Sequence, residues 1–188
     1  DEIRDSAELD FENLKLWSPA SPNLYRIALV TDNDYLEVRT DLRKIEVRGE
    51  SIFLNDQELY LKGCEWMPGS HPDFGMAEPL AHSIHCLRQL KDCGCNFTRF
   101  HWQQDASFFD WCDENGLLIQ EEIPYRGTPR EAGELQLAIA KRQAAEMVFF
   151  HKNHPSIIFW GVGNELECSA PATIRYVEDM VAYFKAQD

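Results

Sequence analysis

Long apolar runs, paired cysteines and positive charge are all scarce in this sequence of 188 residues. No stretch approaches the ~18 consecutive apolar residues of a membrane-spanning helix, which argues against a transmembrane protein. The six cysteines form no CxxC pair, which argues against a zinc or thioredoxin-like redox site. The net charge of -14 argues against nucleic acid or a membrane as a partner, and a solvated acidic surface explains it.

The cysteines that are present favour a cytoplasmic protein. Cys86, Cys93 and Cys112 fall among apolar residues of predicted helices, where a thiol behaves as a small apolar side chain. Residues 1–5 resemble neither a signal peptide nor a translation start, so the N-terminus looks truncated. A cytoplasmic enzyme with reduced, buried cysteines is therefore the expectation.

Alternation of apolar and polar side chains dominates the first fifty residues. Residues 25–29, 35–40 and 45–47 follow this pattern, which is typical of antiparallel strands with one solvated face. A complete β-sandwich needs about seven strands, and too few are present here. Residues 1–48 are therefore predicted to be the last strands of a sandwich.

From residue 49 onward, strands alternate with amphipathic helices. A hairpin is expected around Asn55 and Asp56. Four strands are then predicted near residues 59–63, 96–101, 117–119 and 157–160, and four helices near residues 82–93, 105–115, 134–152 and 171–184. This alternation indicates a parallel sheet covered by helices. The last helix is expected to bury Ile174, Val177, Val181 and Phe184.

Each of the four predicted parallel strands ends in polar or aromatic residues. The first runs into residues 65–66, the second into 99–102, the third into 121–122 and the fourth into 163–165. The carboxyl ends of parallel strands meet at one edge, where barrel and doubly wound enzymes bind their ligands. A buried strand that ends in carboxylates is costly unless those groups are paired or used. The pattern predicts a functional site at this edge.

Hydrolysis of a glycosidic bond fits these residues. A retaining glycosidase needs two carboxylates about 5–5.5 Å apart, one as proton donor and one as nucleophile. Glu165 is the candidate donor, since an apolar strand and Trp160 would desolvate it and favour its protonated form. Asn164 is expected to donate a hydrogen bond to a sugar hydroxyl. Arg99 is expected to offset the negative charge and orient a carboxylate.

Aromatic residues near these strand ends have two readings each. His101 suits hydroxyl binding but is also compatible with a satisfied core histidine. Trp66 and Trp102 suit either sugar stacking or core packing, and both are kept as candidate substrate contacts. Trp160, in mid-strand, is assigned to the core. His154, which precedes a proline, is expected to end a helix.

The two consecutive glutamates at the end of the third strand cannot both face the site. Neighbouring side chains in a strand point to opposite faces. Glu122 is favoured as a site residue over Glu121. Arg99 has a structural alternative, a salt bridge to either glutamate.

The run Asn-His-Pro-Ser-Ile-Ile-Phe-Trp-Gly-Val-Gly-Asn-Glu at 153–165 resembles the acid/base signature of glycoside hydrolase family 2. That family includes β-galactosidases, β-glucuronidases and β-mannosidases. Residues 16–25 resemble its immunoglobulin-like sandwich domain, and residues 54–63 resemble its barrel entry. Residues 96–101 and 113–122 resemble its second and third barrel strands. The resemblance spans nearly the whole chain, in order.

The resemblance implies an α/β fold, the first half of a (β/α)8 TIM barrel at residues 49–188. The C-terminal strands of an immunoglobulin-like β-sandwich would precede it at residues 1–48. The implied activity is that of a retaining exo-β-glycosidase acting on terminal β-linked sugars, with the nucleophile outside this chain. Glu165 would be the general acid/base and Asn164 the contact to the sugar 2-hydroxyl. The resemblance also makes active-site residues of Arg99, His101 and Glu122.

Two departures from the family pattern concern the sugar and a metal. Residues 65–68, Glu-Trp-Met-Pro, are more like the β-mannosidase branch than the galactosidase and glucuronidase branches. Residues 124–127 lack the metal-binding carboxylate and histidine that some β-galactosidases carry after the third strand. No cofactor is therefore expected, and a structural or catalytic divalent metal stays open.

Two other functions remain as alternatives: a non-catalytic carbohydrate-binding or interaction fragment, and an endo-acting barrel glycosidase. The resemblance of residues 16–25 to the sandwich domain of family 2 argues against the second. A closed barrel takes about 250 residues, so this chain by itself is expected to be inactive. Four strands leave two open edges, so the expected partners, besides a carbohydrate substrate, are the remainder of the barrel or a second copy of the chain. The apolar inner face is expected to expose Phe97, Leu118, Ile119, Ile158 and Trp160.

Overall fold

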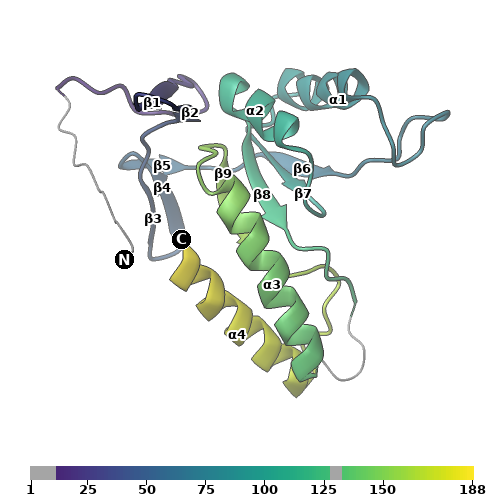
Figure 1. The fold of residues 1–188 in the computed structure, drawn as a ribbon. Helices are drawn as coiled ribbons and strands as arrows, with labels where there is room; N and C mark the ends of the chain where they lie inside the picture. Colours follow the sequence, from purple (N-terminus) through teal and green to yellow (C-terminus); the bar gives the residue numbers. More distant parts are fainter. Residues whose placement is uncertain (1–11, 128–132) are drawn as a thin grey trace.

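The structure is a computed structural model, which describes residues 12–127 and 133–188 (Figure 1). The strands are β1 (Tyr25–Val30), β2 (Tyr35–Thr40), β3 (Ile45–Arg48), β4 (Ser51–Leu54), β5 (Gln57–Leu59), β6 (Gly63–Trp66), β7 (Phe97–Phe100), β8 (Leu118–Glu122) and β9 (Ile157–Gly161). The helices are α1 (Leu80–Asp92), α2 (Ala106–Asn115), α3 (Glu134–His151) and α4 (Pro171–Gln187). No helix in these described segments is long and apolar enough to cross a membrane.

A four-stranded parallel sheet, in the order β6-β7-β8-β9, organises the second part of the chain. One helix follows each strand, so every parallel neighbour is reached through a helical crossover. Helices α3 and α4 lie side by side over one face of this sheet (Figure 1). The alternation of parallel strands and helices predicted from the sequence is confirmed.

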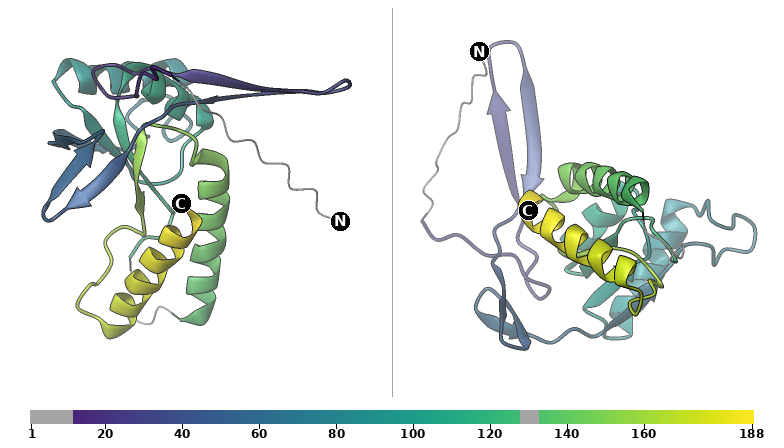
Figure 2. Two further views of the ribbon diagram at one scale, coloured as in Figure 1. Left: turned by 90° about the vertical axis from the view of Figure 1, so that its left-hand side faces the viewer. Right: turned by 90° about the horizontal axis from the view of Figure 1, so that it is seen from below.

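Two smaller antiparallel sheets precede the parallel one. Strands β1 and β2 form a hairpin that projects from the rest of the molecule (Figure 2). Strands β3, β4 and β5 form a three-stranded sheet. The boundary predicted between residues 48 and 49 falls in the turn between β3 and β4 of this sheet. Residues 12–44 contain one two-stranded sheet in the described structure, so the immunoglobulin-like sandwich stays a prediction.

Trp17 fastens the N-terminal segment to the parallel sheet. It is fully buried, packs with Leu54 and Leu118, and its Nε1 donates a hydrogen bond of 2.9 Å to the backbone oxygen of Asp113. The predicted exposure of the apolar inner face is therefore wrong for Leu118, which is covered, whereas Phe97 and Ile158 are half-buried. The predicted exposure of Ile119 is wrong for another reason: Ile119 packs in the core under α1 and α2, on the opposite face of the sheet.

Two apolar cores lie between the strands and their helices. The first joins β6, β7 and β8 to α1 and α2, and its large members include Trp66, Leu87, Phe100, Phe109 and Leu117. The second lies under α3 and α4. Trp160 packs against both cores and stacks on Phe184, with ring centroids 6.1 Å apart, so its assignment to the core is confirmed and its place on the inner face is wrong.

Local signals set the ends of the helices as predicted. The carboxylate of Asp105 accepts a hydrogen bond of 2.9 Å from the backbone nitrogen of Ser107 and caps α2. Gly116 ends α2 in the left-handed region at a φ of 64°. A Cβ there would also lie 2.3 Å from the backbone oxygen of Pro19, so a side chain is doubly unfavourable. Pro171 opens α4.

The predicted inner face of α4 is wrong in part. Ile174 and Val181 are exposed at 44% and 38% of their surface. The buried residues of this helix are Thr173, Tyr176, Met180 and Phe184. Apolar side chains occupy two adjacent faces of α4, and periodicity alone does not tell which of them meets α3 and β9.

Candidate active site

The register of the parallel strands brings their polar ends together. Glu65 of β6 pairs in register with Arg99 of β7, which pairs with Gln120 of β8. Glu122, two residues further along β8, pairs with Gly161 of β9. Side chains two residues apart in a strand share a face. Arg99, Gln120 and Glu122 therefore lie on one face of the sheet, which we call the inner face.

Arg99 links four elements of the fold. Its Nε and Nη2 donate to both carboxylate oxygens of Glu122, at 3.1 and 2.7 Å. Its Nη2 also donates to Oδ1 of Asn164 at 2.8 Å, and its Nη1 lies 3.2 Å from Oε2 of Glu65. The contacts with these carboxylates raise the pKa of Arg99 above its ordinary value, the hydrogen bonds to Glu122 most of all. We call Arg99, Glu65, Glu122 and Asn164 the Arg99 cluster.

Arg99 holds Glu122 in place, and Gly161 on the neighbouring strand leaves the space that the Glu122 side chain fills. Its side chain is only 2% exposed, and Gln120 Nε2 also donates to its Oε2, at 3.3 Å. A Cβ on Gly161 would lie 2.7 Å from Cγ and Oε2 of Glu122. Only glycine at that position of β9 leaves room for this carboxylate. The structural alternative for Arg99, a salt bridge to Glu122, is thus present within the predicted site.

Asn164 follows β9, and its backbone is tied to the segment that follows β8. Its nitrogen donates to the backbone oxygen of Tyr125 at 2.8 Å, and its oxygen accepts from the nitrogen of Gly127 at 2.9 Å. Because Oδ1 accepts from Arg99, the side-chain amide is oriented with its Nδ2 protons as the remaining donors. Such an amide can donate to a sugar hydroxyl.

Glu165 occupies a different environment from the one expected. Its side chain is 65% exposed, and its Oε2 accepts from Nε and Nη2 of Arg126 at 3.1 and 3.0 Å. Trp160 points to α4, so the expected desolvation of Glu165 by Trp160 is wrong. Glu165 has a φ of 52°, in the left-handed region that is uncommon for residues other than glycine. Backbone strain of this kind is concentrated at functional sites.

His101 and Trp102 follow β7, next to the Arg99 cluster. The rings of the two residues stack, with centroids 4.7 Å apart. Nδ1 of His101 lies 3.4 Å from Oε1 of Glu65 and 3.0 Å from the sulfur of Met67. Its Nε2 is buried and has no hydrogen-bond partner within the described residues. His101 therefore supports Glu65 in this structure, and its contact with a sugar stays a prediction, as does that of Trp102.

Trp66 does not belong to the site, so its predicted sugar contact is wrong. It is 7% exposed and packs against Phe100 and Phe108, with both pairs of ring centroids 5.4 Å apart. Strand β6 includes Trp66 as its last residue, one position after Glu65. The alternation of the strand directs Trp66 toward the helices and Glu65 toward the inner face.

Glu121 likewise faces the helices, as expected from its neighbour. It is fully buried, and its Oε1 shares a hydrogen bond of 2.8 Å with Nδ1 of His151 in α3. Burial raises the pKa of Glu121, and the hydrogen bond from His151 offsets part of that effect. This pair lies outside the Arg99 cluster.

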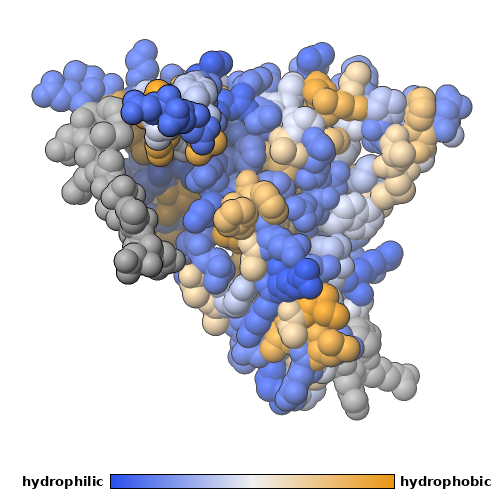
Figure 3. Space-filling view, viewed as in Figure 1, coloured by the Kyte–Doolittle hydropathy of each residue, from blue (hydrophilic) through white to orange (hydrophobic). Residues whose placement is uncertain are grey.

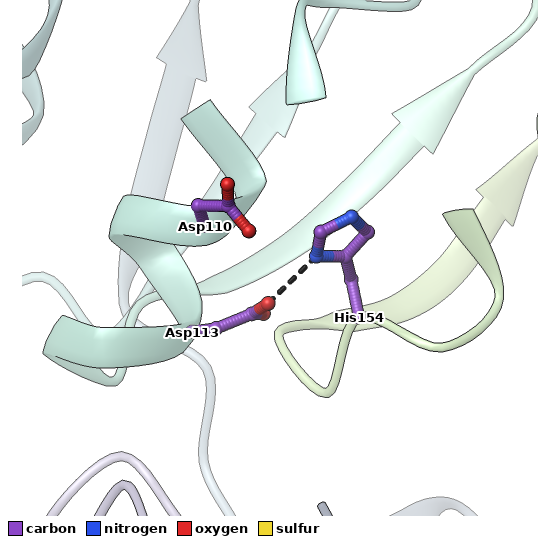
Figure 4. A group of neighbouring side chains, drawn as sticks. All are labelled: Asp110, Asp113 and His154. Atoms are coloured by element: carbon purple, nitrogen blue, oxygen red, sulfur yellow. Dashed lines mark hydrogen bonds and ion pairs between the residues drawn. The ribbon is translucent and has the colours of Figure 1, made fainter. Parts of the chain in front are cut away.

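A group of hydrogen bonds connects α2 to the turn before β9, and Figure 4 shows Asp113 and His154 of this group. His154 does not end a helix, since α3 already ends at His151. Its Nδ1 shares a hydrogen bond of 2.6 Å with Oδ2 of Asp113, and Ser156 donates to Oδ1 through its nitrogen and hydroxyl at 3.1 and 2.5 Å. Asp113, His154 and the exposed Asp110 also have possible ligand atoms close enough together to hold a metal ion. Both oxygens of Asp113 are already used as acceptors, so we interpret the group as a structural tie.

A separate apolar hollow lies away from these polar groups. It measures about 600 Å³ and is lined by Phe149 and Phe150 of α3, together with Gln187 at the end of α4. Figure 3 shows apolar surface over the region of α3, where Leu135 and Ile139 are also exposed. The hollow contains none of the predicted site residues.

Two of the residues at the site, Glu65 and Arg126, have no role that the sequence predicts. Glu65 stands at a strand end, and Arg126 lies in a segment without metal ligands. Glu65 and Trp66 are consecutive residues at the end of the first parallel strand, so their side chains point to opposite faces. With Trp66 toward the helices, this alternation predicts that Glu65 lies on the inner face. Nothing local in the sequence indicates that Arg126 meets Glu165, because 39 residues separate them.

Comparison with known proteins agrees with this geometry. Residues 45–188 match the model of the TIM barrel domain of glycosyl hydrolases family 2. The chain belongs to this family. It is 34% identical over 163 residues to a β-galactosidase of Thermoanaerobacter pseudethanolicus, covering 82% of the chain and 22% of the relative. It is 30% identical over 211 residues to a β-glucuronidase of Streptococcus agalactiae, covering 100% of the chain and 34% of the relative.

A solved structure of a family 2 enzyme superposes on nearly the whole chain. The β-galacturonidase from Eisenbergiella tayi, bound to galacturonate, gives a TM-score of 0.88 at 33% identity, covering 97% of this chain and 33% of that chain. The parallel sheet and its helices therefore belong to a TIM barrel domain. The chain spans between about a fifth and a third of the length of these three relatives.

Proposed function

We propose that the protein containing this chain is a retaining β-glycosidase and that this chain supplies the acid/base half of its active site. The Arg99 cluster is the observation that carries the proposal. Side chains from β6, β7 and β8 and from the segment after β9 converge at the carboxyl ends of the strands, where barrel enzymes place their active sites. Membership of the family supports the same reading.

Glu165 is proposed as the general acid/base. It protonates the glycosidic oxygen as the leaving group departs, and it then removes a proton from the water that completes hydrolysis. The strained backbone of Glu165 fits a residue that is positioned for function. The nucleophilic carboxylate would come from residues outside this chain and approach the opposite side of the sugar.

The Arg99 cluster positions the sugar relative to Glu165. Asn164 presents its Nδ2 as a donor to the 2-hydroxyl group, and Arg99 fixes the orientation of that amide. Glu122 in turn fixes Arg99 through two hydrogen bonds. A contact to the 2-hydroxyl that strengthens in the transition state lowers the barrier to hydrolysis.

The substrate is proposed to be a terminal β-linked sugar, in line with the β-galactosidase, β-glucuronidase and β-galacturonidase names of the relatives. Strands β6 and β9 are the two edges of the parallel sheet. Open edges of this kind pair with further strands, so the remainder of the barrel is the proposed partner of this half. Alone, the chain is expected to hydrolyse no glycoside.

The variant Glu165→Gln tests this function in the protein expressed from the complete reading frame. For aryl β-glycosides with poor leaving groups, kcat/KM should fall about 1,000-fold, within the range for loss of a general acid. Activated leaving groups need little protonation, so their glycosylation step should lose far less. The measurement is kcat/KM across a series of phenols of different acidity.

The control is Glu146→Gln, which removes an exposed carboxylate from α3 on the outside of the fold. Its kcat/KM should match that of the wild type for every leaving group. An equal, small loss in Glu165→Gln for good and poor leaving groups would mean that Glu165 is not the acid.

A further inference from the structure

Arg126 is a cation at the candidate site to which the proposed mechanism gives no role. Its Nε and Nη2 both donate to one oxygen of Glu165, at 3.1 and 3.0 Å. The other oxygen of Glu165, Oε1, takes no part in this pair. A general acid must carry a proton when it donates one. An ion pair that occupies Oε2 restricts the positions that Glu165 can take toward a glycosidic oxygen until the pair opens.

The geometry of this pair makes it easy to open. Arg99 distributes its two donors over both oxygens of Glu122, whose side chain is 2% exposed. Arg126 directs both donors at a single oxygen of Glu165, and the two side chains are 67% and 65% exposed. Ion pairs as exposed as this one contribute little to stability. A carboxylate that offers both of its oxygens can therefore replace Glu165.

Arg126 is also placed and available to bind such a group. Backbone hydrogen bonds tie both flanking residues to Asn164, the residue before Glu165: Tyr125 accepts from its nitrogen and Gly127 donates to its oxygen. The donors of Arg99 are already committed to the Arg99 cluster. In the described segments that follow the four parallel strands (67–79, 101–105, 123–127 and 162–170), Arg126 is the only lysine or arginine.

We infer that Arg126 is a specificity-determining residue that binds a carboxylate carried by the substrate, and that this binding releases Glu165 from its ion pair. The inference rests on the proposed function. The planar guanidinium fork matches the two oxygens of a carboxylate. The carboxylate can belong to the terminal sugar or to the leaving group, since Glu165 would act on the oxygen that joins them.

Matched substrate pairs test this in the protein expressed from the complete reading frame. Nitrophenyl β-galacturonide is compared with the β-galactoside, and β-glucuronide with β-glucoside. A carboxyphenyl β-galactoside is compared with the corresponding phenyl β-galactoside. Each pair gives the ratio of kcat/KM with and without the carboxylate. In Arg126→Gln, the ratio of at least one pair should fall by about 30-fold, as expected when a charged hydrogen-bonded contact is lost.

Arg126→Lys should recover part of that ratio, because it keeps the charge but loses the fork. The control is Arg142→Gln, which removes an arginine from an exposed ion pair with Glu146 on α3. Its ratios should stay within about twofold of the wild type. The pair that responds identifies whether the carboxylate lies on the sugar or on the leaving group.

Ratios that are the same in Arg126→Gln and in the wild type for every pair would overturn the inference, and so would a wild-type preference for the neutral member of every pair. Either result leaves the proposed function standing, because the neutral glycosides are still hydrolysed. A wild-type protein that hydrolyses none of the six substrates would instead count against the proposed function itself.

Discussion

Glu121 and Glu122 are consecutive residues of β8, both buried, and yet they belong to different parts of the molecule. Glu122 lies on the inner face, where Arg99 donates to both of its oxygens. Glu121 faces α3 and pairs with His151, and its Oε2 has no hydrogen-bond partner within the described residues. The alternation of a strand separates a site residue from a structural one in a single step.

Glu121 and Glu122 differ in how well the negative charge of each buried carboxylate is balanced by its neighbours. Arg99 balances the charge of Glu122 and also donates to Asn164. The buried carboxylate of Glu122 therefore helps to position the side chains of the Arg99 cluster. The charge of Glu121 is opposed by burial, which raises its pKa, and only partly favoured by His151. Substitutions at Glu122 and its neighbours should therefore change turnover, and substitutions at Glu121 should change stability.

Among substitutions that bear on Glu121 and Glu122, the largest effect on turnover is expected where the inner face loses its bidentate contact. Arg99→Lys keeps the positive charge but cannot donate to both oxygens of Glu122 and to Asn164 at once. We expect kcat/KM to fall by about 100-fold, the scale of one charge-assisted contact. The check is steady-state kinetics on an aryl β-glycoside, with circular dichroism to confirm folding. Wild-type kinetics would reduce Arg99 to a structural ion pair.

A smaller effect is expected when Glu122 is displaced but its charge is kept. In Gly161→Ala, the new Cβ would meet Cγ and Oε2 of Glu122 at 2.7 Å, so the carboxylate must move away from Arg99. We expect kcat/KM to fall about tenfold, which corresponds to about 1.4 kcal/mol of lost positioning. Steady-state kinetics on the same glycoside measures it. A fully active variant would show that the position of Glu122 is unimportant for turnover.

The smallest effect on turnover is expected on the helix face. Glu121→Gln keeps an acceptor for His151, and kcat/KM should stay within about twofold of the wild type. The pKa of Glu121 is raised above its ordinary value of 4.5, so the folded protein keeps a proton that the unfolded chain loses. The stability linked to this group is present below pH 4.5 and is lost as the pH rises through the folded-state pKa.

That linkage predicts a pH-dependent difference in stability. The melting temperature of Glu121→Gln, relative to the wild type, should increase between pH 4 and pH 7, because the variant has no carboxyl to ionise. Differential scanning calorimetry across this range measures the difference. A constant offset between the two proteins at all pH values would contradict the raised pKa.

The features that the sequence predicted correctly depend on local chemistry. Asp105, Gly116 and Pro171 mark helix ends through the side chain or backbone of one residue, and each acts as expected. The polar strand ends were also recognisable, because glutamates that follow apolar strands are rare without a use. Because side chains alternate between the two faces of a strand, knowing where β8 ends tells that Glu122 faces the site and Glu121 faces the helices.

The features that the sequence missed depend on distant contacts or on the exact end of a strand. Trp66 was kept as a candidate substrate contact because the first strand runs into it, whereas β6 includes Trp66 as its last residue and directs it toward the helices. The desolvation of Glu165 was expected from Trp160 in the preceding strand, but Trp160 packs on α4 instead. The contact of Arg126 with Glu165 joins two loops, and no periodicity predicts such a pair.

The central claim, that the inner face around Arg99 and Glu165 binds the sugar, is tested most directly by a crystal structure. The protein from the complete reading frame would carry Glu165→Gln and be soaked with a slowly hydrolysed β-glycoside. We predict that Nδ2 of Asn164 donates to the 2-hydroxyl, with the side chain at position 165 about 2.6–3.2 Å from the glycosidic oxygen. A sugar bound out of reach of Asn164, as in the hollow beside Phe149 and Phe150, would contradict the account.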